Sequence, residues 1–177
     1  MVSPLPLLIL PAVLGAPSSV VRGNGFEIFL AAPKGWAIEA RPNRYDGLPA
    51  VLFRRGESFR TAKNVMFVNL DRRTDPDLAA FAANRRADFL KSRPGATVRP
   101  IGSLLAGDGH TALVFAFDDP RIGQYERRAY LTTADGIVTL FLQCDTAKAR
   151  GAHAGAFHAL IQTFRDLHAP HPRSTGG

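Results

Sequence analysis

Hydrophobic and polar positions alternate with a period of two along most of the chain, which is the pattern of strands that have one buried face. The segment 26–30 alternates in this way, whereas residues 137–144 are apolar on both faces. A strand that is apolar on both faces is typical of a sheet centre covered on both sides. The strands are predicted at residues 26–30, 36–39, 50–54, 64–70, 98–105, 111–117, 124–133 and 137–144.

Short turn signals join these strands. Pro33-Lys34-Gly35 predicts a first hairpin between residues 26–30 and 36–39. Gly107-Asp108-Gly109 and Ala134-Asp135-Gly136 predict two further hairpins. Pro100 interrupts the strand 98–105, which favours an edge or irregular position.

Two segments change to the helical period of 3.6 residues. The first begins at Thr74 or Asp75, either of which can cap a helix, and ends at Pro94-Gly95. The second runs from about residue 147 to 167. Strands joined by hairpins, with one helix inserted and one terminal, predict an α+β fold: an antiparallel sheet of about six to seven strands with helices packed on its faces. The residues predicted to be buried are Leu78, Phe81, Ala82, Phe89 and Leu90 in the first helix and Phe157, Leu160, Ile161, Phe164 and Leu167 in the second.

An apolar run at residues 5–14 is too short to cross a bilayer, but it suits the hydrophobic region of a signal peptide. A small-x-small cleavage pattern follows at Ala16-Pro17-Ser18, although no Lys or Arg precedes the run. We therefore expect an exported protein, periplasmic or secreted, without a transmembrane segment; a disordered cytosolic tail is the alternative. The expected division is a leader at residues 1–24, a single domain at 25–168 and a flexible tail at 169–177.

The net charge is +7, from 22 Lys and Arg against 15 Asp and Glu. The arginine doublets are spread over the chain, whereas a nucleic-acid binder concentrates its charge on one element with interleaved aromatics. We therefore expect no nucleic-acid partner and interpret the arginines as a solvated surface; an anionic partner or membrane surface is the alternative.

No catalytic or metal-binding signature is recognised. His153 and His158 are five residues apart, so they do not share a helical face well. Cys144 lies in an apolar run, which predicts a buried and inert thiol. Asp118 and Asp119 precede a proline and are expected to shape a turn and face water. The expectation is a protein without a cofactor, without a metal and without enzymatic activity.

Arginine and aromatic side chains occur together in two segments, and this combination is enriched at protein interfaces. The alternative is that Phe59 pins its own loop and the arginines are solvated. The candidate partner-binding residues are Tyr45, Arg54, Arg55, Phe59 and Arg60 in the first segment and Tyr125 and Arg127 in the second.

The order of the elements resembles the PsbP/Mog1-like superfamily, which includes bacterial DUF1795-type domains. The resemblance spans residues 26–167 and is carried by the Pro-x-Gly-Trp turn at 33–36, the turn at 107–109, the segment 124–130 and the closing helix at 157–164. It implies an α/β/α sandwich. Trp36 is expected to close the core, with its indole N–H bonded to an acceptor.

Members of that superfamily include photosystem II extrinsic subunits, a nuclear Ran-binding protein, bacterial periplasmic proteins and cytosolic chaperones for secreted toxins. The resemblance therefore implies a binding or accessory role and carries over no partner-binding residue. The leading hypothesis is an exported, non-enzymatic binding or accessory protein that acts through protein or anionic-ligand contacts. The alternatives are a cytosolic chaperone that shelters apolar client segments and an unrecognised hydrolase.

Overall fold

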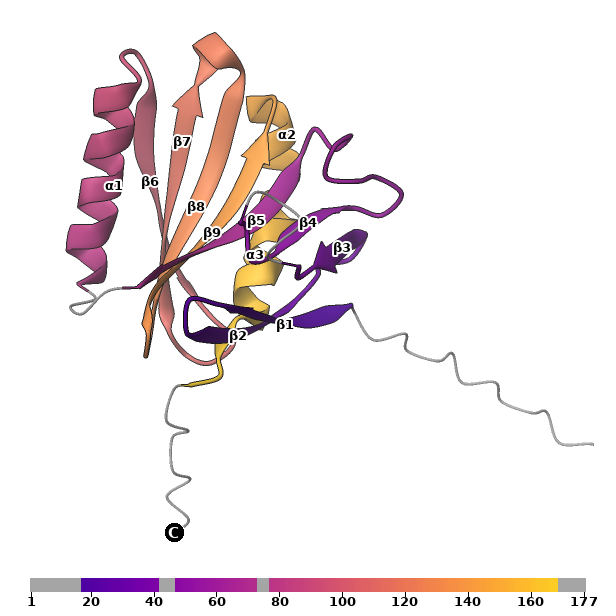
Figure 1. The fold of residues 1–177 in the computed structure, drawn as a ribbon. Coiled ribbons are helices and arrows are strands. Elements are labelled where there is room, and N and C mark those ends of the chain that lie inside the picture. The colour runs from indigo at the N-terminus through magenta and orange to yellow at the C-terminus, as the bar shows by residue number, and fades with distance from the viewer. Residues whose placement is uncertain (1–16, 42–46, 73–76, 169–177) are drawn as a thin grey trace, which may run out of the picture.

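The computed structural model describes residues 17–41, 47–72 and 77–168. It contains a seven-stranded antiparallel sheet of order β3-β4-β5-β9-β8-β7-β6 and a three-stranded sheet of order β1-β2-β10. In Figure 1, α1 lies beside β6 at one edge of the large sheet, and the loop between β4 and β5 projects at the other edge. The elements are β1 (Ser18–Gly23), β2 (Phe26–Ala31), β3 (Trp36–Glu39), β4 (Val51–Arg54), β5 (Val65–Arg72), α1 (Leu78–Ser92), β6 (Thr97–Leu105), β7 (Thr111–Asp119), η1 (Pro120–Ile122), β8 (Gln124–Thr133), β9 (Gly136–Cys144), α2 (Ala147–Ala152), α3 (Ala154–Thr163) and β10 (Arg165–Asp166).

The predicted positions of two strands are confirmed. β9 is the fourth strand of seven and pairs with β5 on one side and β8 on the other, as its two apolar faces require. β6 is an edge strand, and its register with β7 shifts between Pro100 and Gly102. Proline has no N–H for a ladder hydrogen bond, which explains the irregularity at this position.

The larger core lies between one face of the large sheet, α3 and the small sheet. Side chains of β5 and β9 that alternate along their strands, such as Val68 and Leu140, meet Phe157 of α3 and Ile28 of β2 there. Phe164, which ends α3, is also fully buried in this core.

A second, smaller core lies under α1 on the opposite face of the sheet. Phe81 and Phe89 of α1 pack there with Phe117 of β7 and Tyr130 of β8. The Asp77 carboxylate caps α1 by accepting hydrogen bonds from two backbone N–H groups at 3.0 Å. The two predicted caps, residues 74 and 75, lie outside the described residues. Leu90, predicted to be buried, is 42% exposed.

The predicted first hairpin is wrong. β2 pairs with β1 and β10, and β3 pairs with β4. The turn at 33–35 is present, with the Trp36 N–H bonded to the Pro33 carbonyl at 2.9 Å, but it carries the chain from one sheet to the other. β1 occupies residues 18–23, within the segment that the sequence pattern assigned to the leader, so the folded domain extends at least to Ser18.

The predicted closing helix is interrupted. α2 ends at Ala152, α3 begins at Ala154, and residues 165–166 form a strand. Gly151 and Gly155 flank the break, and glycine disfavours a helix interior by about 1 kcal/mol relative to alanine. Leu167, predicted to be buried, is 40% exposed because the helix has already ended.

Two expectations for single side chains also change. Trp36 is fully buried as predicted, but its indole nitrogen has no hydrogen-bond partner among the described residues; the ring meets His153 edge-on at 5.4 Å. Asp118 and Asp119 end β7 and do not face water: Asp119 is 1% exposed and bonds to Arg121, whereas Asp118 pairs with Arg150. Ion pairs with neighbouring arginines offset the desolvation cost of burying these carboxylates.

Candidate functional site

α1 covers only part of its sheet face. The core beneath it draws on β7, β8 and the start of β9, and it does not include the side chains that β4, β5 and the rest of β9 direct to the same face. Val65, Phe67 and Phe141 lie on the part of this face that α1 does not cover, belong to neither core cluster and are all half-buried. We call these three residues the aromatic shelf. Val51 and Phe53 of β4 are on the same face and are buried.

The register of the strands explains how the aromatic shelf forms. Phe67 on β5 pairs directly with Phe141 on β9. Their rings stack with centroids 4.4 Å apart and planes 10° apart. Directly opposed aromatic residues stabilise a sheet, and here the pair also leaves part of an apolar surface open to solvent. Exposed apolar surface of this kind marks interaction sites when it is contiguous.

An ion pair borders the aromatic shelf on the side of α1. The Arg128 guanidinium lies 5.1 Å from the Phe141 ring centroid, 4.0 Å from that of Phe117 and 5.0 Å from that of Phe89. Its Nε donates to the Glu126 carboxylate at 2.7 Å, and the side chains are 13% and 2% exposed. Arg128 therefore links the core under α1 to the edge of the aromatic shelf.

The loop between β4 and β5 borders the aromatic shelf at another side. Residues 54–63, here called the basic loop, contain four exposed cationic side chains, Arg54, Arg55, Arg60 and Lys63, and one exposed carboxylate, Glu57. Phe59 is half-buried. The basic loop leads into Val65, the first residue of β5, so its C-terminal end is next to the aromatic shelf. Arg54, at its other end, pairs with Trp36 and faces the α2–α3 side, where its charge acts on His153.

Hydrogen bonds give the basic loop a defined shape. The Ser58 N–H donates to the Thr61 hydroxyl at 3.1 Å, and the Arg55 guanidinium donates to the Trp36 carbonyl at 3.4 Å. Of the predicted first group, Arg54, Arg55, Phe59 and Arg60 thus lie together on this loop. Tyr45 lies outside the described residues.

The second predicted group lies elsewhere. Tyr125 and Arg127 are on the opposite face of β8, on the side covered by α2 and α3, and both are half-buried. Arg127 Nη1 is 3.3 Å from His158 Nε2 of α3, and the Arg150 guanidinium of α2 is 6.0 Å from the Tyr125 ring centroid. The structure does not join these two residues to the basic loop in one surface.

Burial governs the protonation of this second group. Burial lowers the pKa of Arg127, and burial together with the Arg127 charge lowers the pKa of His158. The guanidinium can only donate, so the neutral imidazole of His158 accepts at Nε2.

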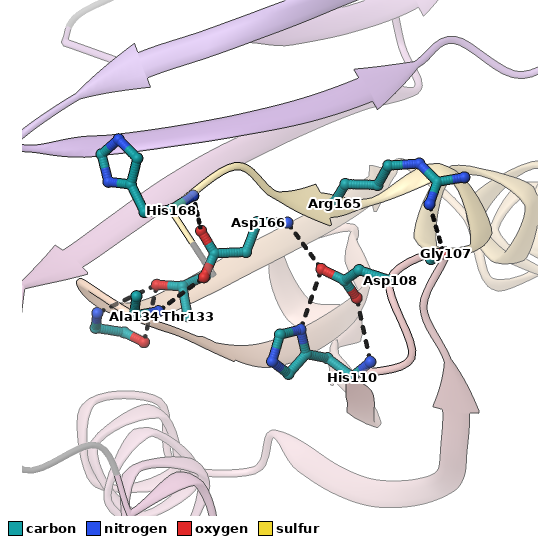
Figure 2. Close-up of polar contacts among 9 residues, drawn as sticks. Gly107, Asp108, His110, Thr133, Ala134, Arg165, Asp166 and His168 are labelled. Atoms are coloured by element: carbon teal, nitrogen blue, oxygen red, sulfur yellow. Dashed lines mark hydrogen bonds and ion pairs between the residues drawn. The ribbon is translucent and has the colours of Figure 1, made fainter. Parts of the chain in front are cut away.

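A polar network that the sequence analysis did not predict fastens β10 to the hairpin ends of the large sheet (Figure 2). The Asp166 carboxylate accepts from the backbone N–H groups of Ala134 and His168 at 2.7 and 3.0 Å. The Asp108 carboxylate accepts from the Asp166 N–H at 2.7 Å and lies 3.0 Å from His110 Nδ1. These carboxylates bond mainly to backbone, so the network is a structural fastening of the C-terminal strand.

The described residues offer neither a metal site nor a reactive thiol. No cluster of His, Cys, Asp and Glu able to hold a metal ion occurs within residues 17–41, 47–72 and 77–168. Cys144 is 2% exposed, and burial raises the pKa of its thiol to about 12, which confirms the predicted buried thiol. In the same described ranges, no helix is long and apolar enough to span a membrane.

The layers described above, with α1 on one face of an antiparallel sheet and α3 with a small sheet on the other, define an α/β/α sandwich. The fold is PsbP/Mog1-like. The solution structure of the cyanobacterial PsbP protein CyanoP from Synechocystis sp. PCC 6803 matches with a TM-score of 0.56 at 12% identity, over 89% of this chain and 97% of that one.

A crystal structure of PA94, a Pseudomonas aeruginosa protein of unknown function, matches with a TM-score of 0.47 at 14% identity, over 89% of this chain and 99% of that one. No family model matches the sequence, and neither does any curated protein. The structural match to CyanoP confirms the fold predicted from the sequence.

Proposed function

We propose that this protein is a non-enzymatic binding or accessory protein that captures an apolar protein segment flanked by acidic residues. One observation carries the proposal: the stacked pair Phe67–Phe141 is partly exposed on a sheet face that α1 does not cover, and the basic loop, with exposed Arg55, Arg60 and Lys63, leads into the strand that carries Phe67. Partly exposed aromatic rings supply contact area at low entropic cost, and neighbouring arginines select acidic partners.

The rigidity of the surface supports the same function. Phe67 and Phe141 are on strands in the middle of the large sheet, and the basic loop is hydrogen-bonded within itself. A preorganised surface binds more tightly because less order is lost on association. Export through the leader is part of the proposal. Cleavage after the small-x-small pattern at residues 16–18 would remove Pro17 and Ser18, the first residue of β1, and would leave residues 19–23 of that strand paired with β2.

The experiment is selection of displayed random peptides on the full-length protein. We expect the enriched peptides to combine an aromatic or aliphatic centre with Asp or Glu on either side. Phe67→Ala should weaken a selected peptide by about 2 kcal/mol, roughly thirtyfold in Kd, the loss typical of a central aromatic anchor. Arg60→Ala with Lys63→Ala should weaken it less and reduce its dependence on salt.

Leu105→Ala is the matched control, because Leu105 is 66% exposed on β6, at the opposite edge of the sheet from the basic loop. Peptide affinity should be unchanged in this variant. The proposal is wrong if the selected peptides carry no acidic residues, or if Leu105→Ala weakens binding as much as Phe67→Ala. N-terminal sequencing of the protein purified from the cytosol of its native cells tests export separately; an intact residue 1 there would exclude it.

A further inference from the structure

Two adjacent arginines of β8 have different surroundings. Arg128 faces α1 and pairs with the buried Glu126. Arg127 faces α2 and α3, and among the described residues no carboxylate lies within ion-pair distance of it. Its Nε is buried without a hydrogen-bond partner. Unpaired buried charge is rare because its desolvation is not offset, so the contrast between neighbours points to a missing counter-ion at Arg127.

The surroundings of Arg127 are cationic as a whole. In the register of the sheet, Arg127 on β8 and Arg99 on β6 flank Ala116 of β7 from either side. Asp118, the next residue of β7 that faces the same way, already pairs with Arg99 at 3.4 Å and with Arg150 of α2. The Arg99 and Arg150 guanidinium groups therefore share the one carboxylate of Asp118, and Arg127 has no carboxylate partner among the described residues.

Ala116, which lies between the two arginines, has a small side chain and is 1% exposed. Arg99, 61% exposed, lies toward solvent, whereas Arg150 is 10% exposed. The cluster is thus reached from outside at Arg99 and is bounded on the inside by Arg127, with His158 of α3 in contact with Arg127.

We propose that Arg127, His158 and Arg99 hold the oxyanion of a small ligand, a carboxylate or phosphate group, between β6–β8 and α2–α3. Guanidinium groups suit such ligands because their planar donors match paired oxygen acceptors. The site is on the opposite face of the sheet from the aromatic shelf, so it is independent of the proposed protein-binding function.

The site also couples ligand binding to a proton. His158 faces Arg127 from β8, and burial together with that charge keeps the imidazole neutral in the empty site. The other titratable or charged groups in the surroundings are Arg150 of α2, the buried Cys144 of β9, Asp118 of β7 and Arg99 of β6. An added negative charge favours the imidazolium, so binding should take up a proton at His158.

The test is an NMR titration of the His158 ring in the full-length protein, assigned with His158→Gln, in sodium chloride, sodium acetate and sodium phosphate at equal ionic strength. We expect acetate or phosphate, but not chloride, to raise the pKa of His158 by roughly one unit, which equals about tenfold tighter binding to the protonated form. The acetate and phosphate arms show which oxyanion geometry fits.

Arg127→Met should abolish the shift, and Arg22→Met, which removes an exposed arginine paired with Glu27, should leave it intact. A thermal melt in chloride checks folding, and Arg127→Met should melt no lower than the parent, because it removes an unpaired half-buried charge. If Arg127→Met does not fold, calorimetric measurement of anion binding in two buffers replaces this variant. The parent protein should then take up a proton on binding, and His158→Gln should bind the anion without proton uptake.

The proposal is overturned if neither oxyanion shifts the His158 pKa beyond the chloride value, or if the shift survives in Arg127→Met. It is also overturned if proton uptake is the same in His158→Gln as in the parent. None of these results depends on the peptides selected by the aromatic shelf.

Discussion

Arg128→Met isolates the ion pair at the border between α1 and the aromatic shelf. The substitution keeps a long, flexible side chain over the rings but removes the positive charge that faces Glu126. Since the Glu126 side chain is 2% exposed, it cannot regain its hydration without a change in the surrounding structure. The hydrogen bond from Gln124 to Glu126 remains in the variant and limits the loss.

Removing one member of a buried ion pair destabilises a protein by about 3–5 kcal/mol, because the remaining charge stays buried. Loss of the cation–π contacts with Phe89, Phe117 and Phe141 adds about 0.5–2 kcal/mol at each well-placed ring. Sulfur–aromatic contacts of the new methionine return about 0.3–1.5 kcal/mol each. The two aromatic terms largely offset each other, so the expected loss in the free energy of unfolding is about 3–5 kcal/mol.

The assay is urea unfolding followed by circular dichroism. Arg127→Met is the matched control, because it removes an equal charge from the next residue, where no carboxylate is left behind; it should change stability by less than about 1 kcal/mol. The double variant Glu126→Gln/Arg128→Met should recover at least about 2 kcal/mol relative to additivity. A loss below about 1 kcal/mol in Arg128→Met, or additive single variants, would refute the reasoning that Glu126 depends on this guanidinium.

Three further outcomes are expected. Gly107→Ala should destabilise the fold by about 1–3 kcal/mol in urea unfolding, because its Cβ would lie 2.4 Å from the Gln162 carbonyl oxygen. His168, 2.6 Å from Asp135, has a pKa above the ordinary 6.5, so its stabilisation is complete below pH 6.5 and is lost as the pH rises through the folded-state value. Asp135→Asn should flatten that pH dependence in thermal melts. Cys144, with a pKa of about 12, should not react with a thiol reagent at pH 8 until denaturant is added.

The strands of the large sheet could be predicted because their signals are local. Alternation of apolar side chains and tight Gly-containing turns gave β7, β8 and β9 with errors of at most two residues. The pairing of β2 could not be predicted in the same way. One partner, β1, lies in the segment that was assigned to the leader. The other, β10, lies more than 130 residues further along the chain and contains two residues, too few for any period to be visible.

The candidate site shows the same division between local and non-local information. Exposure of Arg54, Arg55 and Arg60 followed from a polar loop between two strands. The aromatic shelf was not predicted, because Phe67 and Phe141 have ordinary strand positions. Only the placement of α1 over the other half of that face leaves them partly open, and a helix's position on a sheet is set by packing between distant elements.

Contacts between several arginines and aromatic rings reduce the cationic surface that is available to a partner. Arg85, Arg93 and Arg128 lie over phenylalanine rings of the core under α1, at 4.0–5.0 Å from the centroids, so the expectation of a solvated arginine surface does not hold for them. A planar guanidinium stacks on an aromatic ring in a way that an ammonium does not, which is a physical reason for arginine at these positions. The cationic side chains that remain available to an acidic partner are then mainly those that do not stack on an aromatic ring. Among the described residues, the basic loop carries three of them, Arg55, Arg60 and Lys63, and leads into the aromatic shelf; this combination of exposed charge and partly exposed apolar surface favours a binding role for this face.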